Sequence, residues 1–368
     1  LCALVLGEML RKSIELKRDH VPLSWAWLNG LLGDEETRTI LPYLQFIGAI
    51  RAAGERGKWY QLKPNKYRFT EEYAQQPLGV VAVDAKHIRR YKEYRNQRLQ
   101  KAISSAPINK MLWEDLQHLS IHPTWTEAMP SFTEGQWQKE WAWLRSYEAI
   151  TNRDFYFHCT VSETQAYPGR IYSTFCNTPS VLRSYALLDG EPLVCIDVKA
   201  SQPFLHSTLI PESEEKRRYL KSVYSGNFYE DIGKAGNWEG ESREKLKAAV
   251  FTSVFYGRTI PVEKDPIWEA FTSLYPMLAE AITNEKREHY SKLAVKMQYL
   301  EAEIILHTAL PALKARVPEC RVLTVHDAIY VRKEHVLDAT REMVYAFKKH
   351  TGHIPALKLE TPPQFLCF

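Results

Sequence analysis

The sequence is organised around one stretch, Val322-Leu323-Thr324-Val325-His326-Asp327-Ala328-Ile329-Tyr330-Val331. Two runs of β-branched and aromatic residues flank a two-residue polar break, and this pattern predicts a tight β-hairpin. A His-Asp pair at the tip of such a hairpin is presented to whatever lies above the sheet.

A second aspartate ends another short apolar run, Val194-Cys195-Ile196-Asp197. Two aspartates on adjacent strand ends can hold two Mg²⁺ ions about 3.5–4 Å apart, the arrangement used for in-line phosphoryl transfer. Each aspartate alone also fits a structural role, Asp327 in the hairpin turn and Asp197 at a strand end. The pair therefore has to be judged together with the rest of the chain.

The composition is that of an ordinary soluble globular protein, with 45% hydrophobic and 25% charged residues among 368. This length allows two or three domains. The net charge of +4 is small, so any affinity for nucleic acid has to come from local basic clusters. No apolar run approaches the about 20 residues of a membrane span. The six cysteines form no Cys-x-x-Cys pair, which argues against zinc and fits the reducing cytoplasm.

Residues 1–72 resemble a small winged-helix domain, with three helices followed by a β-hairpin. Candidates for phosphate contacts on its third helix and wing are Arg38, Lys58 and Lys66. Pro42 lies inside the presumed recognition helix and is expected to kink or shorten it. Winged helices also serve as protein-contact modules, so nucleic acid and protein both remain open as partners.

Residues 73–150 read as a helical region, either a thumb or a linker. The segment 86–101 carries seven Lys and Arg residues and the single acid Glu93. Arg89, Arg90 and Arg95 are therefore candidates to grip a nucleic-acid duplex. The alternative interpretation of such a charge run is a solvated helix face.

From about residue 151 the pattern changes to short strands, expected at 155–158 and 169–173. After the strand that ends at Asp197, helical patterns alternate with loops through 203–317. A helix at 335–349 and a last strand near 356–359 follow the hairpin. The segment 151–368 is therefore expected to form one α+β core.

The helical run after Ser242 provides an independent test. Arg243, Lys247, Phe251 and Phe255 are spaced by four residues and share one helix face. Two cations followed by two aromatic rings fit the phosphates and the base of a nucleoside triphosphate. Tyr256-Gly257 then ends the helix. The alternative is an amphipathic helix with basic residues, which is commonplace.

Taken together along the chain, the motifs resemble the palm and fingers of the family A DNA polymerases and of their relatives, the single-subunit phage and mitochondrial RNA polymerases. The order is Gly-Arg-x-Tyr-Ser, an aspartate-ended strand, Arg-x₃-Lys…Tyr-Gly, a glutamine-bearing helix and a His-Asp hairpin. The resemblance covers about residues 165–350. It implies a right-hand polymerase architecture, with an antiparallel palm sheet and helical fingers and thumb, preceded by the winged-helix domain.

This resemblance implies a role for each matching residue. Asp197 and Asp327 would be the catalytic carboxylates that bind two Mg²⁺ ions, with Mn²⁺ as a substitute and the Val198 carbonyl as a further ligand. The nucleotide-binding residues would be Arg243, Lys247, Phe251, Phe255, Tyr256 and Gln202. Contacts to the growing strand and its template would come from Arg170, Gln298 and His326.

Three positions depart from the family pattern. Phe255 stands at the family's spacing of eight residues after Lys247, and Tyr256 comes one later, so either ring is a candidate to stack on the nucleotide. Gln202 stands where the DNA polymerases carry a glutamate that excludes the ribose 2′-OH, which predicts weak discrimination between dNTPs and NTPs. Ala328 stands where a glutamate usually follows the His-Asp pair, nearer the RNA polymerase pattern.

The expected function is extension of a DNA or RNA 3′ end on a primer-template, with DNA synthesis favoured and a phage, plasmid or mobile-element context. An RNA polymerase or a primase-like enzyme of the same superfamily is the alternative. Two non-enzymatic hypotheses also remain. One is a degenerate palm acting as a nucleic-acid-binding replication or defence factor. The other is a DNA-binding regulator with an unrelated helical C-terminal part. The sequence identifies no protein partner.

Overall fold

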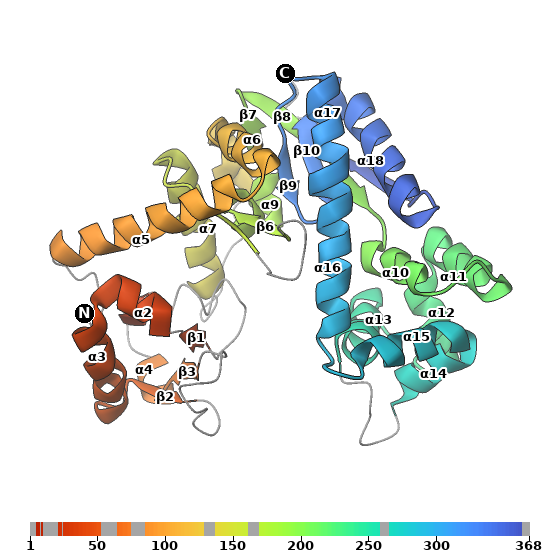
Figure 1. Cartoon of the computed structure of the whole chain (residues 1–368), viewed down its shortest axis with the longest axis horizontal. Helices are drawn as coiled ribbons and strands as arrows, with labels where there is room; N and C mark the ends of the chain where they lie inside the picture. Colours follow the sequence, from red (N-terminus) through yellow and green to blue (C-terminus); the bar gives the residue numbers. More distant parts are fainter. Residues whose placement is uncertain are drawn as a thin grey trace. The chain divides into compact units, whose positions relative to one another are not determined.

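The computed structural model describes residues 5–7, 9, 21–23, 25–52, 65–74, 85–128, 137–160, 169–257 and 265–362. They form helices and antiparallel sheets (Figure 1), which confirms the α+β class. Two compact units are present: Leu1–Ala102, Met129–Ala149 and Asn177–Pro179 make one, and Ile103–Ala128, Ile150–Cys176 and Ser180–Phe368 the other. The domain boundaries expected at residues 72 and 150 stay predictions. Within the described ranges, no helix has both the length and the apolar character needed to cross a membrane.

The first unit combines a small antiparallel sheet, in the order β1–β3–β2, with several helices. Its described elements are β1 (Val21–Leu23), α2 (Trp25–Leu32), α3 (Asp34–Phe46), β2 (Ile50–Ala52), β3 (Asn65–Phe69), α4 (Glu71–Ala74), most of α5 (Ala85–Ser104) and most of α7 (Trp137–Thr151). Helix α3 runs through Pro42 and ends before Gly48, whose φ of 71° suits glycine. The expectation that Pro42 shortens this helix is therefore wrong. Strand β1 was not predicted.

In its described residues, the second unit contains eight strands and most of the helices. The strands are β4 (Leu119–Ile121), β5 (Phe157–Cys159), β6 (Ile171–Ser173), β7 (Ala186–Leu188), β8 (Glu191–Val198), β9 (Leu323–Val325), β10 (Ala328–Arg332) and β11 (Leu357–Glu360). The α-helices are α6 (Pro107–Leu116), α8 (Thr174–Asn177), α9 (Ser180–Arg183), α10 (Ser201–His206), α11 (Glu214–Ser225), α12 (Phe228–Ala235), α13 (Arg243–Val250), α14 (Pro266–Leu274), α15 (Pro276–Lys286), α16 (Lys292–Ile304), α17 (Leu310–Arg316) and α18 (Val336–Thr351). Short 3₁₀ helices are η1 (Pro123–Ala128), η2 (Ser207–Leu209) and η5 (Lys333–His335), and π-helical turns are η3 (Phe251–Tyr256) and η4 (Ile305–Ala309).

The main sheet of this unit has six antiparallel strands, in the order β4–β7–β8–β10–β9, with β11 also pairing with β8. Strand β8 is central, and Ile196 on it and Ile329 on β10 face each other and are buried. The strands expected near 155–158, 169–173 and 356–359 and the helix expected over 335–349 are confirmed as β5, β6, β11 and α18. Strand β4, from the region expected to be helical, was not predicted.

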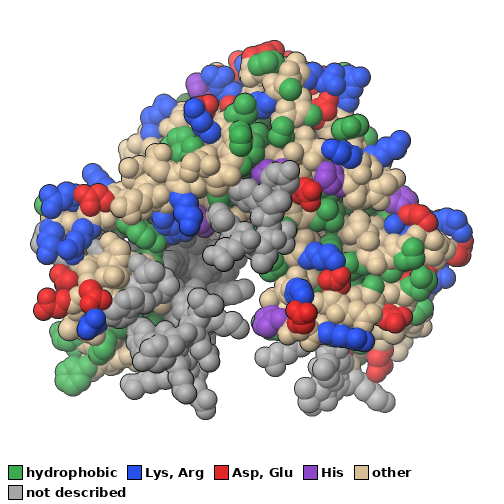
Figure 2. Space-filling model, in the orientation of Figure 1, with side chains coloured by type: hydrophobic (Ala, Val, Ile, Leu, Met, Phe, Trp, Pro, Cys, Tyr) green, Lys and Arg blue, Asp and Glu red, His purple; other side chains and the backbone are tan. Residues whose placement is uncertain are grey.

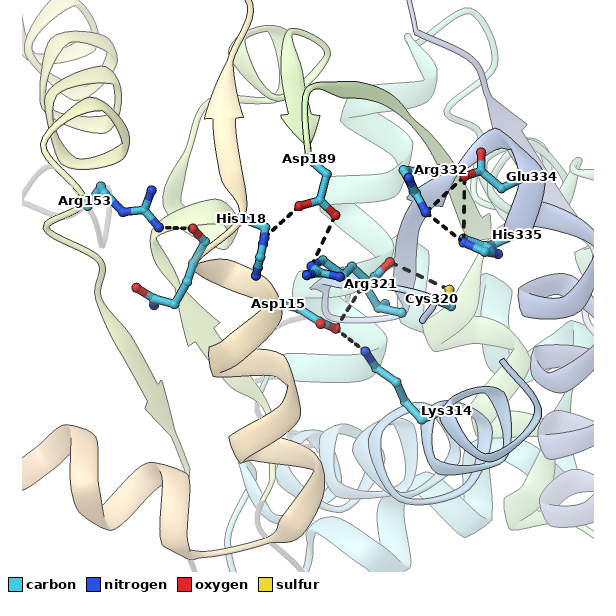
Figure 3. A network of polar contacts seen from close by, with 12 residues as sticks. Asp115, His118, Arg153, Asp189, Lys314, Cys320, Arg321, Arg332, Glu334 and His335 are labelled. Carbon is cyan, nitrogen blue, oxygen red and sulfur yellow. Dashed lines mark hydrogen bonds and ion pairs between the residues drawn. The ribbon is translucent and has the colours of Figure 1, made fainter. Parts of the chain in front are cut away.

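A polar network holds the segment that leads into the hairpin (Figure 3). Asp115 of α6 accepts hydrogen bonds from the Lys314 ammonium at 2.5 Å and from the backbone N–H of Val322 at 2.9 Å. The Asp115 and Lys314 side chains are only 9% and 8% exposed, so this pair is costly to break. Next to Val322, Arg321 pairs at 3.2 Å with Asp189, in the turn between β7 and β8. The start of β9 is thereby tied to two other elements.

Candidate active site

Asp197 and Asp327 lie on neighbouring strand ends of the second unit. Asp197 is the penultimate residue of β8, and Asp327 is the second residue of the two-residue loop between β9 and β10. Strand β10 pairs directly with β8, with Ile329 opposite Ile196. The sheet therefore carries both carboxylates to the same end of adjacent strands, and the predicted hairpin is confirmed.

The two carboxylates lie in a site that disfavours their negative charges. Burial, followed by the charge of Asp327, raises the pKa of Asp197 to about 6. Burial, followed by the charge of Glu301, raises the pKa of Asp327 to about 6, against the opposing effects of the Ser201 hydroxyl and Arg170. Carboxylates crowded in this way are stabilised by a proton or a cation.

The donor set at this site fits a hard cation. Two carboxylates and a main-chain carbonyl at Val198 are the oxygen ligands that Mg²⁺ prefers. The backbone N–H of Val198 also lowers the pKa of Asp197 by hydrogen bonding to its carboxylate. The described ranges contain no cluster of three or more His, Cys, Asp or Glu side chains arranged as a metal site. The predicted ion binding therefore rests on the aspartate pair and Val198.

A buried charge cluster lies beside Asp327. Arg170, which precedes β6, makes a bidentate ion pair with Glu301 of α16, with both N–O distances at 2.8 Å. The Gln202 amide donates a further hydrogen bond to Glu301 at 2.9 Å. Glu301 is 1% exposed, and its ionised carboxylate can only accept hydrogen bonds. One of the two N–H donors of the Gln202 amide is therefore used by Glu301, and Arg170 is held in one orientation.

His326 and Gln298 lie near this cluster. His326 adopts a φ of 57°, the left-handed conformation that the first position of a two-residue hairpin loop requires. Its ring contacts that of Tyr172 edge to face, with centroids 5.7 Å apart. Burial, followed by Arg170 and Arg183, lowers the pKa of His326 to about 4, so the ring is neutral at pH 7. Gln298 is half-buried on α16, one turn before Glu301.

The predicted triphosphate residues lie on α13. Lys247 is exposed, and its ammonium lies 5.8 Å from the centroid of the Phe251 ring. Arg243 donates a hydrogen bond to the Gly226 carbonyl at 2.8 Å, forms an ion pair with Glu230 and lies over the Tyr229 ring. Lys247 is therefore the more accessible cation, because Arg243 already has a carboxylate partner.

The helix that carries these residues changes type at Phe251. The turn η3 is π-helical, so it holds one more residue than an α-turn would. This extra residue places Tyr256 near the face that position 255 would occupy in a regular helix. The late tyrosine noted in the sequence is thus accommodated by the backbone.

Phe255 is a core residue and not a free ring. It is fully buried, lies 4.2 Å from the ring of His206 and stacks with Phe228. The prediction that Phe255 binds nucleotide is corrected on this ground, because its faces are already packed. Tyr256 is only partly buried, and the pKa of its hydroxyl, raised by burial, also responds to Arg170 and to Glu301. Tyr256 is therefore the ring that lies at the site.

The basic helix α5 is partly engaged within the first unit. Arg90 donates a hydrogen bond to the carbonyl of Leu32 at the end of α2, a position that attracts cations. The exposed side of α5 carries Arg89 and Lys92, and Figure 2 shows Lys and Arg side chains gathered over its N-terminal half. Arg95 is half-buried, 5.7 Å from the centroid of the Tyr91 ring. Arg90 has a structural contact, and Arg89 is the freer candidate.

The other basic candidates lie in the N-terminal part of the first unit. Arg38 is on the exposed side of α3 and pairs with Asp34 at 2.8 Å. Lys66 is in β3, but its side chain is outside the described part of the chain, as is the whole of Lys58. Of these three side chains the structure therefore describes only that of Arg38, whose charge is partly neutralised by Asp34.

Comparison of the sequence with models of known protein families and with curated proteins finds no match.

Sequence reasoning missed three side chains near the aspartates. Glu301 was not singled out, although a glutamate between Met297 and Ile304 interrupts an apolar helix face and could have been noticed. Lys358 of β11 lies directly opposite Asp197 and pairs with Glu360 at 2.5 Å. The pairing of β11 with β8 carries no local sequence signal.

Proposed function

We propose that this protein is a nucleotidyltransferase that extends the 3′ end of a nucleic-acid strand by metal-assisted phosphoryl transfer. The observation that carries the proposal is the pair Asp197 and Asp327 on adjacent strand ends, where burial and then the charge of Asp327 raise the pKa of Asp197. Two neighbouring carboxylates cost free energy, and turn residues alone do not require them, so the pair indicates a function.

The chain's own residues divide the work of this reaction. Asp197 and Asp327 would hold the cations, with the Val198 carbonyl as a further ligand. Bound Mg²⁺ supplies Lewis acidity for the 3′-hydroxyl and for the departing pyrophosphate. Lys247 on α13 is exposed and would neutralise the triphosphate directly. Arg243 would have to leave its ion pair with Glu230 to bind the triphosphate.

The charge cluster would orient the growing strand. Glu301 holds Arg170 by a bidentate pair, so the guanidinium is pre-organised rather than mobile. His326 is neutral, so its ring would offer a hydrogen bond to the 3′ end without adding positive charge. DNA synthesis is favoured over RNA synthesis, and the alternative is an RNA polymerase or a primase-like enzyme of the same superfamily.

A primer-extension assay tests the proposal. Labelled dNTPs and NTPs are supplied separately, with Mg²⁺ or Mn²⁺, with and without a template. We expect incorporation by the wild type and none by Asp197→Asn or Asp327→Asn. Glu280→Gln, an exposed carboxylate on α15, is the matched control and should be fully active. Full incorporation by either aspartate variant would overturn the assignment, and nucleic-acid binding without incorporation by the wild type would favour a degenerate palm.

A further inference from the structure

Lys286, the last residue of α15, is a buried cation that the proposed chemistry does not use. Its side chain is 3% exposed. The ammonium donates hydrogen bonds to the carbonyl of Val254 at 2.6 Å and to the carbonyl of Gly257 at 3.0 Å. Val254 lies in the π-helical turn η3 and Gly257 caps its C-terminal end, where backbone acceptors have no partner within the helix.

The two carbonyls bracket Tyr256. Gly257, the next residue, turns back so tightly that a Cβ atom on it would lie 1.8 Å from the Thr252 carbonyl oxygen. Only glycine fits there, so the Tyr-Gly sequence has a steric cause. The Lys286 ammonium bridges this turn, because it binds one carbonyl before Tyr256, that of Val254, and one after it, that of Gly257.

The surroundings of Lys286 contain few charges. Within the described part of the chain, it has no carboxylate partner in ion-pair range, and burial lowers its pKa to about 8. His206 of α10 is the titratable group that responds to its charge, and burial lowers the pKa of His206 to about 4, so that ring is neutral. A cation buried without a counter-charge is expensive, and such groups concentrate at functional sites.

We propose that Lys286 is a positioning residue, which clamps the Val254 and Gly257 carbonyls and so holds Tyr256 at the site occupied by Arg170 and Glu301. The part of this inference that concerns catalysis rests on the function proposed above. The clamp itself does not, because it is a statement about the order of one turn. A cation at the C-terminal end of a helix stabilises the last carbonyls, which here belong to a π-turn of the kind found at functional sites.

Hydrogen–deuterium exchange tests the clamp in the full-length protein. Lys286→Met keeps the length of the side chain and removes the donor. We expect exchange in residues 251–257 to rise at least about tenfold, because both charge-assisted hydrogen bonds, to the Val254 and Gly257 carbonyls, are lost. Lys286→Arg should restore part of the protection. Lys234→Met removes an exposed lysine in the last turn of α12 and should change nothing in this segment. Unchanged exchange at residues 251–257 in Lys286→Met would overturn the clamp.

A measurement on the wild type covers the case in which Lys286→Met does not fold. Exchange is compared at pH 7 and pH 9.5 and corrected for the intrinsic rate. Deprotonation of Lys286 should raise exchange selectively in residues 251–257, and a uniform response along the chain would overturn the clamp.

In the primer-extension assay, Lys286→Met should raise KM for the nucleotide with primer-template affinity unchanged. A wild type without incorporation would overturn the proposed function and leave the exchange result standing.

Discussion

Asp327 destabilises the metal-free protein at neutral pH, because its folded environment disfavours the carboxylate. Its pKa rises from 3.8 to about 6, so the folded state binds more protons than the unfolded state between these values. Stability therefore falls as pH rises through this window, and the whole penalty is present above about pH 6.

Asp327→Asn should consequently raise the free energy of unfolding by about 1–2 kcal/mol at pH 7.5, after allowance for the weakened interactions with the Ser201 hydroxyl and Arg170, which lower the pKa of Asp327. The gain should shrink as pH is lowered towards 4.5. Urea unfolding at both pH values measures this, with Glu280→Gln as the control. Mg²⁺ should stabilise the wild type and not the variant. A variant less stable than the wild type at pH 7.5 would contradict the charge assignment.

Gln202 illustrates how a neighbour changes the meaning of a residue. From its position alone, its amide was a candidate donor to a ribose hydroxyl, but one of its two N–H groups is bound to Glu301 at 2.9 Å. Selection between dNTPs and NTPs through the amide would therefore depend on its second N–H, or would require this buried bond to break.

Gln202→Glu should therefore act first on stability. It places two carboxylates in hydrogen-bond contact in a buried site, so one of them has to be protonated. We expect a loss in Tm that is larger at pH 8 than at pH 5, because protonation relieves the repulsion. Gln202→Leu, which removes the hydrogen bond without adding charge, should lose stability equally at both pH values. Identical pH dependence of the two variants would show that Glu301 is not at this contact.

At the scale of the element, the π-turn η3 that follows α13 compensates for Tyr256, which comes one residue later in the sequence than the family spacing after Lys247. A π-turn is an α-helix with one residue inserted. Removal of one residue from η3 should therefore let the helix continue as α-helix, with Tyr256 eight residues after Lys247.

Deletion of Thr252, which is exposed in η3, should leave Tm within about 5 °C of the wild type, a change of roughly 1 kcal/mol or less. Nucleotide incorporation should persist. Deletion of Ala248 in the α-helical part is the control, because it rotates the buried Leu246 away from Val250 and should unfold the region. Thermal melts and primer extension measure both. Equal damage from the two deletions would show that η3 has no residue to spare.

At the scale of the whole molecule, the basic helix α5 supplies exposed positive charge in the first unit. The first unit uses Arg90 internally and leaves Arg89 and Lys92 exposed on α5. Removing residues 1–72 would cut through this unit, since α5 packs on α2 through Arg90. Point substitutions on α5 therefore separate nucleic-acid binding from folding better than a truncation does.

Arg89→Ala combined with Lys92→Ala should reduce the slope of log affinity for duplex DNA against log salt by about 1–2, since each phosphate contact contributes about 0.9. Arg90→Ala should leave the slope unchanged and lower Tm, because it removes the contact to the Leu32 carbonyl. Fluorescence anisotropy at several salt concentrations measures the slopes. If all three substitutions left the slope unchanged, α5 would be a solvated helix face, the alternative set out for its charge run.

Local features of the sequence were sufficient for several predictions. The His326-Asp327 hairpin, the strand that ends at Asp197, the last strand and helix α18 follow from residue periodicity and turn chemistry, which act over a few neighbours. The π-turn was detectable only as an anomaly, a tyrosine one residue late, since the choice between an α- and a π-turn depends on what packs around it.

Tertiary structure alone decided the partners. Glu301 lies 131 residues from Arg170 and 99 from Gln202 along the chain, and no local pattern encodes contacts at such separations. The same holds for Lys286, 32 residues from the Val254 carbonyl that it caps. Periodicity shows which face of an element is buried, but not which element covers that face. For this reason the sequence alone pointed to Asp197 and Asp327, and only the fold showed the charges around them.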